Sequence, residues 1–203
     1  MRAVGEAVGF AVRKIVTGLF MSLDGIVEAD DDWQFAYFDD ELLAGSTAGW
    51  ARAGATVMHR HSYEGYDRLR VEHPRSPTVA FLDEIPRYVA STTLDEPSWP
   101  NTTVLGGDVH EQVTQLKQQP GKDILVLGSP TLVRWVLGNG LLDELNFSVL
   151  PIIVGSGVRL FEDMDMPAGH VALTLEGTST LASGVLQVSY TPTGVRSGSE
   201  HRD

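Results

Sequence analysis

The stretch DILVLGSPTLVRWVLGNGLLDEL, residues 123–145, contains the pattern that decides the fold. Residues 124–127 are an unbroken apolar run, which is typical of a strand buried on both faces of a parallel sheet. Gly128 and Ser129 interrupt the run, and apolar residues at helical spacing follow as far as Gly138, a helix stop signal. The stretch therefore predicts a strand, a glycine turn and a helix.

The predicted turn at residues 128–131 has two interpretations that the stretch alone leaves open. A glycine turn before a helix directs backbone N–H groups and the positive helix end beyond the strand, where α/β proteins bind phosphates. An ordinary connection would use the same glycine and serine for the backbone alone. This stretch by itself favours neither interpretation.

The order of elements outside this stretch indicates an α/β fold. Strands and helices alternate through the first two thirds of the chain, and the last third contains strands at residues 145–154, 171–179 and 185–191, with a hairpin turn at Ser183 and Gly184. The longest of these strands contains Pro151, which indicates an edge or a bulge. We expect a mixed sheet, mostly parallel, with antiparallel C-terminal strands and helices on both faces.

Composition narrows the classes of function. The 203 residues predict a single domain at 13–191, with an N-terminal extension at 1–12 and a flexible C-terminal tail at 192–203. A net charge of −12 argues against nucleic-acid binding, and no apolar run is long enough to cross a bilayer, so we expect no membrane association. The chain has no cysteine, which excludes thiolate metal sites and suits the cytoplasm.

Three groups of side chains are candidates for function. Arginine and histidine gather at residues 59–75, which form either a solvated loop after a short helix or an anion site. Histidines at 59 and 61 lack a carboxylate at metal-ligand spacing, so we expect no metal. Trp33, Phe35 and Tyr37 lie within a short aromatic segment that is either a lid on the core or a wall for a planar ligand. Asp24, in a tight turn before Gly25, is a weak catalytic candidate.

Several segments together resemble a known family. Residues 57–64, VMHRHSYE, resemble a segment of dihydrofolate reductases, in which an arginine is followed by a basic residue, a hydroxyl residue, an aromatic residue and glutamate. Residues 126–129 before a helix resemble the second glycine turn of that fold. Residues 22–25, 138–145 and 151–160 look more like the reductase branch related to the C-terminal domain of the riboflavin-biosynthesis protein RibD.

This resemblance implies a three-layer αβα sandwich, dihydrofolate reductase-like, that binds NADPH at the carboxyl ends of its strands. It implies contacts with the 2′-phosphate for Arg60, His61 and Ser62, with the adenine ribose for Ser91 and Thr92, and with the nicotinamide for Met21 and Ser22. It implies that the pyrophosphate lies on the turn and helix start formed by Gly128, Ser129, Pro130, Thr131 and Leu132. It also implies a homodimer.

The sequence departs from the family pattern at two positions. His59 stands where the family has glycine, so its side chain either crowds the cofactor or adds a phosphate contact. Gly128 is followed by Ser129, where dihydrofolate reductase has a second glycine. We expect a cytoplasmic NADPH-dependent reductase of a small heterocyclic C=N or C=O substrate. The alternative is a catalytically silent nucleotide-, pterin- or flavin-binding protein of the same fold.

Overall fold

The computed structural model describes residues 12–29, 33–162, 164 and 170–196. The predicted N-terminal extension therefore lies outside the described residues, except for Val12. The last strand continues to Arg196, beyond the predicted strand end at residue 191. The rest of the predicted tail lies outside the described residues.

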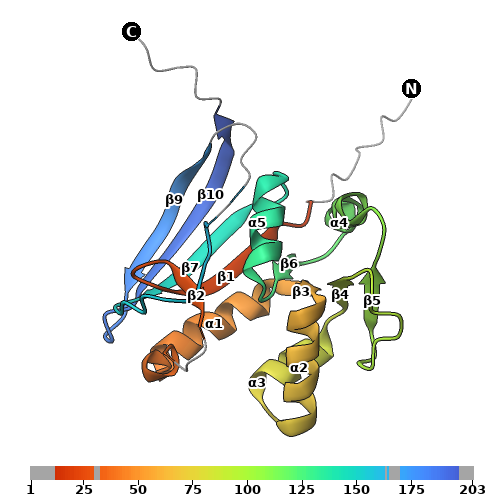
Figure 1. Cartoon of the computed structure of the whole chain (residues 1–203), viewed down its shortest axis with the longest axis horizontal. Helices are drawn as coiled ribbons and strands as arrows, with labels where there is room; N and C mark the ends of the chain where they lie inside the picture. The colour runs from red at the N-terminus through yellow and green to blue at the C-terminus, as the bar shows by residue number, and fades with distance from the viewer. Residues whose placement is uncertain (1–11, 30–32, 163, 165–169, 197–203) are drawn as a thin grey trace, which may run out of the picture.

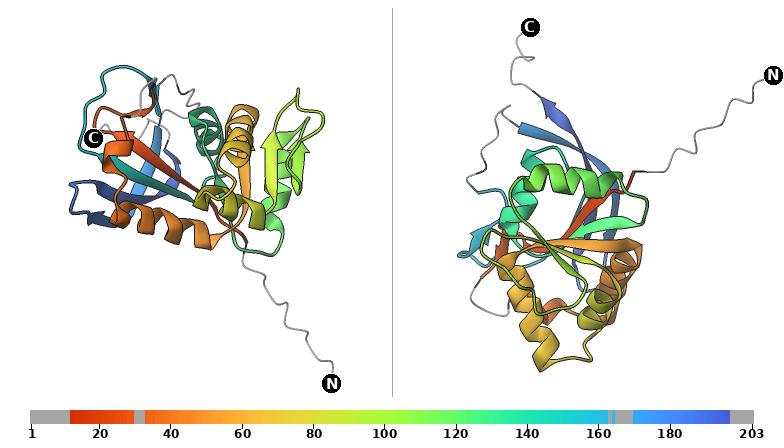
Figure 2. Two further views of the ribbon diagram at one scale, coloured as in Figure 1. Left: turned by 90° about the horizontal axis from the view of Figure 1, so that it is seen from below. Right: turned by 90° about the vertical axis from the view of Figure 1, so that its right-hand side faces the viewer.

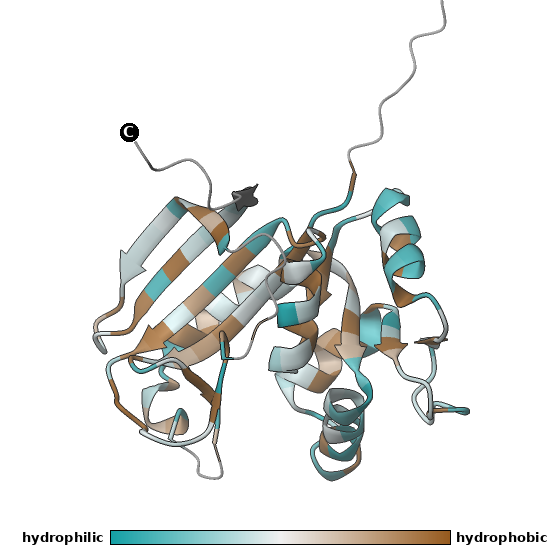
Figure 3. Cartoon of the chain, turned by 45° about the horizontal axis from the view of Figure 1, so that its top comes forward, coloured by the Kyte–Doolittle hydropathy of each residue, from teal (hydrophilic) through white to brown (hydrophobic). Residues whose placement is uncertain are grey.

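A mixed sheet forms the centre of the molecule (Figure 1). Its strands, in spatial order, are β5 (Thr102–Leu105), β4 (Arg87–Ala90), β3 (Ala53–His59), β6 (Asp123–Val126), β1 (Ile15–Ser22), β7 (Glu144–Leu150), β10 (Leu186–Arg196) and β9 (His170–Thr180). The first six are parallel to one another. Strands β10 and β9 are antiparallel to their neighbours, as predicted, and Figure 3 shows alternating polar and apolar residues along this hairpin. Strands β2 (Ile26–Glu28) and β8 (Val158–Arg159) form a separate small sheet.

Helices cover both faces of the sheet, which confirms the predicted three-layer αβα sandwich (Figure 2). On one face lie α4 (Val109–Gln118) and α5 (Pro130–Gly138), and on the other lie α1 (Asp40–Arg52), α2 (Arg60–Glu72) and α3 (Pro77–Glu84); the short 3-10 helix η1 spans Phe35–Tyr37. Neighbouring residues of β3 explain the layering, because Val57 packs with α4 and α5 and Met58 packs with α2 and α3. Alternate side chains of a strand point to opposite faces, so these strands are apolar on both sides.

Two elements differ from the sequence prediction. Helix α2 is longer than the expected short helix, and it carries Arg68 and Arg70, which the prediction assigned to a loop. It ends at Glu72 because Pro74 disfavours helical geometry in the residue before it. Strand β7 ends at Leu150 rather than at residue 154, because Pro151 has no N–H to continue the ladder.

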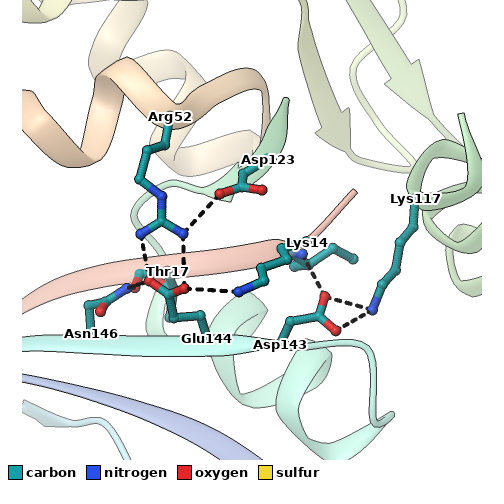
Figure 4. A network of polar contacts seen from close by, with 9 residues as sticks. Lys14, Thr17, Arg52, Lys117, Asp123, Asp143, Glu144 and Asn146 are labelled. Carbon is teal, nitrogen blue, oxygen red and sulfur yellow. Dashed lines mark hydrogen bonds and ion pairs between the residues drawn. The ribbon is translucent and has the colours of Figure 1, made fainter. Parts of the chain in front are cut away.

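An ion-pair network holds the amino ends of the central strands (Figure 4). Arg52, at the end of α1, donates two hydrogen bonds of 2.9 Å to the Glu144 carboxylate and one of 3.0 Å to Asp123. Lys117 pairs with Asp143 at 2.6 Å, and Asp143 accepts a hydrogen bond of 2.7 Å from the Ile15 N–H. The network therefore ties α1 and α4 to the first residues of β1, β6 and β7. The hydrogen bond from Arg52 is the largest cause that lowers the pKa of the buried Glu144.

Replacing Arg52 by methionine should lower the free energy of unfolding at pH 7 by about 1–2 kcal/mol, because Glu144 loses its main partner while Arg52 itself is half exposed. Glu144 has a lowered folded-state pKa, so its stabilising contribution exists above the ordinary glutamate pKa and disappears as the pH falls through the folded value. Urea unfolding at pH 7 and pH 3 measures both effects. The difference in the free energy of unfolding between the Arg52 variant and the wild type should be smaller at pH 3 than at pH 7. The control Arg68→Met, on the exposed face of α2, should leave the free energy of unfolding unchanged at both pH values.

Candidate functional site

The amino ends of two helices meet at the carboxyl edge of the parallel strands. Helix α5 follows β6 through Gly128 and Ser129, and helix α2 follows β3 directly at Arg60. A Cβ atom at Gly128 would lie 2.7 Å from the Ser62 hydroxyl, so the turn before α5 lies directly against the first turn of α2. Helix amino ends carry unpaired N–H groups and a partial positive charge, and both ends therefore favour an anion in the same place.

The turn before α5 has an unusual backbone. Gly128 has φ +69° and Ser129 has φ +38°, a left-handed region that a serine adopts at an energetic cost. The Ser129 hydroxyl accepts a hydrogen bond of 3.4 Å from the Leu132 N–H and so caps α5. Pro130 is the first residue of the helix and is buried, whereas Thr131 is exposed. The chain thus presents a tight turn without a Cβ at position 128 where a phosphate could approach the backbone.

Arg60 joins the start of α2 to the loop after β4. Its Nε donates to Glu64 Oε1 at 2.6 Å, and its Nη1 donates to Thr93 Oγ1 at 2.6 Å. The Ser91 hydroxyl accepts hydrogen bonds of 3.1 Å and 3.0 Å from the N–H groups of Thr93 and Leu94, which fixes the turn. The structure therefore brings together the predicted residues Arg60 and Ser91. The predicted residue Thr92 is exposed and lies between Ser91 and Thr93 in the loop.

Two histidines complete this basic rim. His59 is the N-cap residue of α2 but makes no side-chain cap hydrogen bond, and its side chain is exposed. His61 is also exposed, and Ser62 is half-buried beside Gly128. The His59 imidazole therefore lies at the protein surface, not in the interior.

A buried tryptophan fixes the loop that carries Ser91 and Thr93. Trp99 donates from its ring N–H to Asp83 at 2.7 Å, and its backbone N–H donates to the Tyr63 hydroxyl at 2.9 Å. The Arg87 guanidinium stacks over the indole at 4.4 Å from the ring centroid. The loop is therefore anchored to α2 and α3 and holds a fixed place relative to Arg60.

Asp24 acts as an acceptor that holds two loops together. Its carboxylate accepts hydrogen bonds from the Ser22 hydroxyl at 2.7 Å, the Val154 N–H at 3.1 Å and the Gly155 N–H at 2.9 Å. These hydrogen bonds lower the pKa of Asp24 to about 2, and the one from Ser22 has the largest effect. An ionised carboxylate can orient neighbouring groups but has no proton to donate. The catalytic role of Asp24 therefore stays a prediction, restricted to orienting other groups.

Met21 and Ser22, which the resemblance places beside the nicotinamide, lie at the end of β1. The Ser22 side chain is buried and accepts a hydrogen bond of 2.9 Å from the Ile26 N–H. Met21 is half-buried and packs against the core cluster on the α5 side of the sheet. Both residues are therefore at the carboxyl edge, where Gly128 and Ser129 also lie.

A cavity of about 1110 Å³ opens beside this edge and runs between α1 and the sheet. Phe20 and Phe38 line it with an edge-to-face contact at 4.8 Å, and Trp50 and Phe81 line it as a stacked pair at 5.2 Å. Gly128 and Ser129 line its mouth as well. The cavity therefore extends from the turn before α5 into an aromatic chamber.

The predicted aromatic wall is divided by the fold. Phe35 lines the cavity. Trp33 is 8% exposed and packs with Leu42 in a separate core cluster, and the Tyr37 hydroxyl donates to the Pro151 carbonyl at 3.3 Å. Neither Trp33 nor Tyr37 is among the residues that line the cavity.

Several residues of the site were missed by the sequence reasoning. Thr93, which Arg60 contacts, and the cavity residues Gly18, Trp50, Tyr66 and Phe81 come from five different segments of the chain. No local pattern marks them, because only the packing of α1, α2 and α3 on the sheet brings them together. Among the described residues, no three histidine or acidic side chains gather as a metal site would require, and no helix is long and apolar enough to cross a membrane.

Gly128→Ala should lower the free energy of unfolding by about 2 kcal/mol, because the residue has φ +69° and the added methyl group would meet Ser62 Oγ at 2.7 Å. Gly65→Ala is the matched control, since a Cβ at that position of α2 has no neighbour within 4 Å and alanine favours a helix. Thermal and urea unfolding of both variants measure the difference. Equal stability of the two variants would contradict the close approach of the turn to α2.

Asp24→Ala should free the N–H groups of Val154 and Gly155, whose hydrogen-deuterium exchange should become about tenfold faster or more. The lowered pKa of Asp24 means that wild-type protection is complete above pH 4 and is lost as the pH falls towards 2. Asp40→Ala, at an exposed position, is the control and should leave both amides unchanged. Unchanged exchange in the Asp24 variant would show that the carboxylate does not hold this loop.

Comparison with known proteins agrees with this architecture. The family model of the RibD C-terminal domain matches residues 13–187. The uncharacterized protein YyaP of Bacillus subtilis (strain 168) is 28% identical over 186 residues, which cover 88% of this chain and 94% of that protein.

Solved structures share the fold. A putative riboflavin biosynthesis protein from Shewanella sp. PV-4 superposes with a TM-score of 0.72 at 19% identity, covering 89% of this chain and 99% of the other. Dihydrofolate reductase from Enterococcus faecalis, complexed with NADP(H) and RAB-propyl, gives a TM-score of 0.60 at 11% identity, covering 89% and 97%. The α/β fold is therefore dihydrofolate reductase-like, as predicted, and the family match over residues 13–187 shows that the chain belongs to the RibD C-terminal domain family.

Proposed function

We propose that this chain is an NADPH-dependent reductase that transfers a hydride to a C=N or C=O group of a small heterocyclic compound. The observation that carries the proposal is the meeting of two helix amino ends, one of which begins at Arg60, next to an aromatic cavity that Gly128 and Ser129 line. The two helix amino ends suit a phosphorylated dinucleotide, and the aromatic cavity suits a planar substrate. The family match and the fold shared with an NADP(H) complex support this assignment.

The donor set fits NADPH along its length. Arg60, His61 and Ser62 would hold the 2′-phosphate, for which a guanidinium and a hydroxyl are suitable partners, and the exposed His59 imidazole would add a contact at the same rim. Ser91 and Thr92 would flank the adenine ribose. The pyrophosphate would lie on the turn and helix start formed by Gly128, Ser129, Pro130, Thr131 and Leu132, whereas Met21 and Ser22 would flank the nicotinamide.

NADPH, when bound, supplies the hydride, and one proton completes the reduction, so that substrate, NADPH and H⁺ give reduced substrate and NADP⁺. The residues of the chain would position the reacting groups. Phe35, Phe38 and Phe20 lie at the cavity and would orient a planar ring. Asp24 is ionised, so we assign it the role of fixing the loop beside the nicotinamide end while solvent supplies the proton.

One observation favours the alternative of a catalytically silent nucleotide-, pterin- or flavin-binding protein of the same fold. The acids near the site already have structural partners, because Asp39 caps α1 through the Leu42 N–H at 2.8 Å and Glu41 accepts from the Ala182 N–H at 2.9 Å. Hydride transfer to any carbonyl or imine substrate, followed at 340 nm, would exclude this alternative.

We also propose that the protein acts as a cytoplasmic homodimer. The segment 151–157 is the candidate contact, since Ile153 within it is 72% exposed. Burial of this exposed side chain against a second copy of the chain would be stabilising. The absence of cysteine from the sequence suits a reducing compartment.

Arg60→Ala should weaken NADPH binding by about tenfold or more and NADH binding by far less, because only NADPH carries the 2′-phosphate. Intrinsic tryptophan fluorescence follows both titrations. Arg68→Ala is the matched control, since Arg68 is an exposed arginine on the same helix and should leave both affinities unchanged. Equal losses for the two cofactors would contradict the 2′-phosphate assignment, and absence of binding of either cofactor to the wild type would overturn the proposed function.

A further inference from the structure

The inner half of the cavity, beneath α1, has a composition unlike the rest of the interior. Helix α5 buries Leu132, Val133 and Val136 against the sheet, whereas Leu42 is the single buried residue of α1. Four of the α1 residues that line the cavity are small, namely Gly45, Ser46, Ala48 and Gly49, and the others are Leu43, Trp50 and Arg52. Small residues on the helix leave space above the strands, and the fold gains little apolar burial there.

The sheet beneath α1 presents a square of four neutral polar side chains. Ser148 of β7 lies opposite Gln187 of β10, and Asn146 lies opposite Ser189 in the same antiparallel pair. All four line the cavity. The Gln187 amide nitrogen reaches so far towards α1 that a Cβ at Gly45 would lie 2.7 Å from it. The four side chains of this floor carry no charge and offer the hydroxyl groups of Ser148 and Ser189 to a ligand. The Asn146 amide nitrogen already donates to the Thr17 carbonyl at 3.0 Å and to Glu144 at 3.1 Å.

The charged groups that line the cavity, among the described residues, carry a net charge of −1, from one cation and two anions. Among the described residues that line it, Arg52 is the single cation, and Glu28 and Glu144 are the anions. Arg52 uses its guanidinium on Glu144, with two hydrogen bonds of 2.9 Å, and on Asp123 (Figure 4). The basic residues of α2 that would bind the cofactor are not part of the lining. A phosphate, sulfonate or carboxylate beneath α1 would therefore lose its hydration without gaining a cation.

The outer half of the cavity is apolar and suits a flat ring. The Trp50 and Phe81 rings lie nearly parallel, with an interplanar angle of 12°, and Leu125 and Leu127 line the cavity beside them. Gly18 of β1 adds no side chain to the sheet surface there. The cavity lining thus combines an aromatic section, a neutral polar floor and the turn at Gly128 and Ser129.

We infer that the substrate of this reductase is an uncharged planar compound whose far end makes neutral hydrogen bonds beneath α1. Its reducible carbonyl or imine would lie at the carboxyl end of β1, beside the proposed nicotinamide position at Met21 and Ser22. This inference rests on the proposed function for the direction of the substrate, because the cofactor edge fixes which end reacts. It excludes substrates that carry an anionic group at the far end.

The matched probes are isatin and isatin-5-sulfonate, which share a reducible dicarbonyl edge and differ by one anionic group on the far side of the ring. Calorimetric titration, without NADPH and with saturating NADPH, should show isatin binding about tenfold tighter or more. In turnover, the hydride adds to the C3 carbonyl carbon and a proton adds to its oxygen, while NADPH becomes NADP⁺. Equal or tighter binding of the sulfonate, or no binding of isatin, would overturn the inference.

Adding a cation beneath α1 should reverse the preference. Ser148→Arg and the more exposed Ser179→Arg, both in the cavity lining, should improve sulfonate binding relative to isatin by about tenfold. Thr174→Arg adds the same charge to the exposed strand β9 outside the lining and should leave the ratio unchanged. An unchanged ratio in both cavity variants would show that the far end does not lie beneath α1. Titrations without NADPH report on the cavity even if NADPH fails to bind, so the two proposals fail separately.

Discussion

The contact between the turn at Gly128 and the first turn of α2 sets the geometry of the functional edge. Two parallel strands, β3 and β6, lie side by side, and each is followed by a helix that starts at the same edge. Their amino ends come together because position 128 has no side chain. The anchored loop after β4 then adds Arg60's partner Thr93 to the same edge. The partial charges of two helices and the charge of one arginine are thus concentrated in a protein that is acidic as a whole.

This concentration of positive potential explains how a chain of net charge −12 could hold a polyanionic cofactor. Helix ends and backbone N–H groups supply potential that a count of side chains does not reveal. The cavity beneath α1 has the opposite design, since its one arginine is neutralised by Glu144 and Asp123. The proposed cofactor site and the proposed substrate site therefore differ in electrostatic character.

Much of the fold could be predicted from local patterns. The strand, turn and helix of residues 123–138, the cap at Asp39 and the positive φ of Gly25 all follow from residue types at fixed spacing. The end of β7 was misplaced because apolar residues continue past Pro151, and the missing N–H there outweighs hydropathy. The aromatic segment could not be assigned side chain by side chain. Burial of Trp33 and exposure of Phe35 depend on which way a short 3-10 helix turns against α1.

The polar floor beneath α1 has a thermodynamic consequence. The heat-capacity change of a structural transition follows the apolar area that it exposes. Local movement of the part of α1 that carries Gly45, Ser46 and Gly49, away from the polar floor, would expose little apolar surface. Movement of α5 would expose more, because its buried leucines and valines face the core. The free energy of displacing this part of α1 would therefore have a small heat-capacity change, unlike the free energy of global unfolding. Temperature would act differently on access to the cavity and on the stability of the fold.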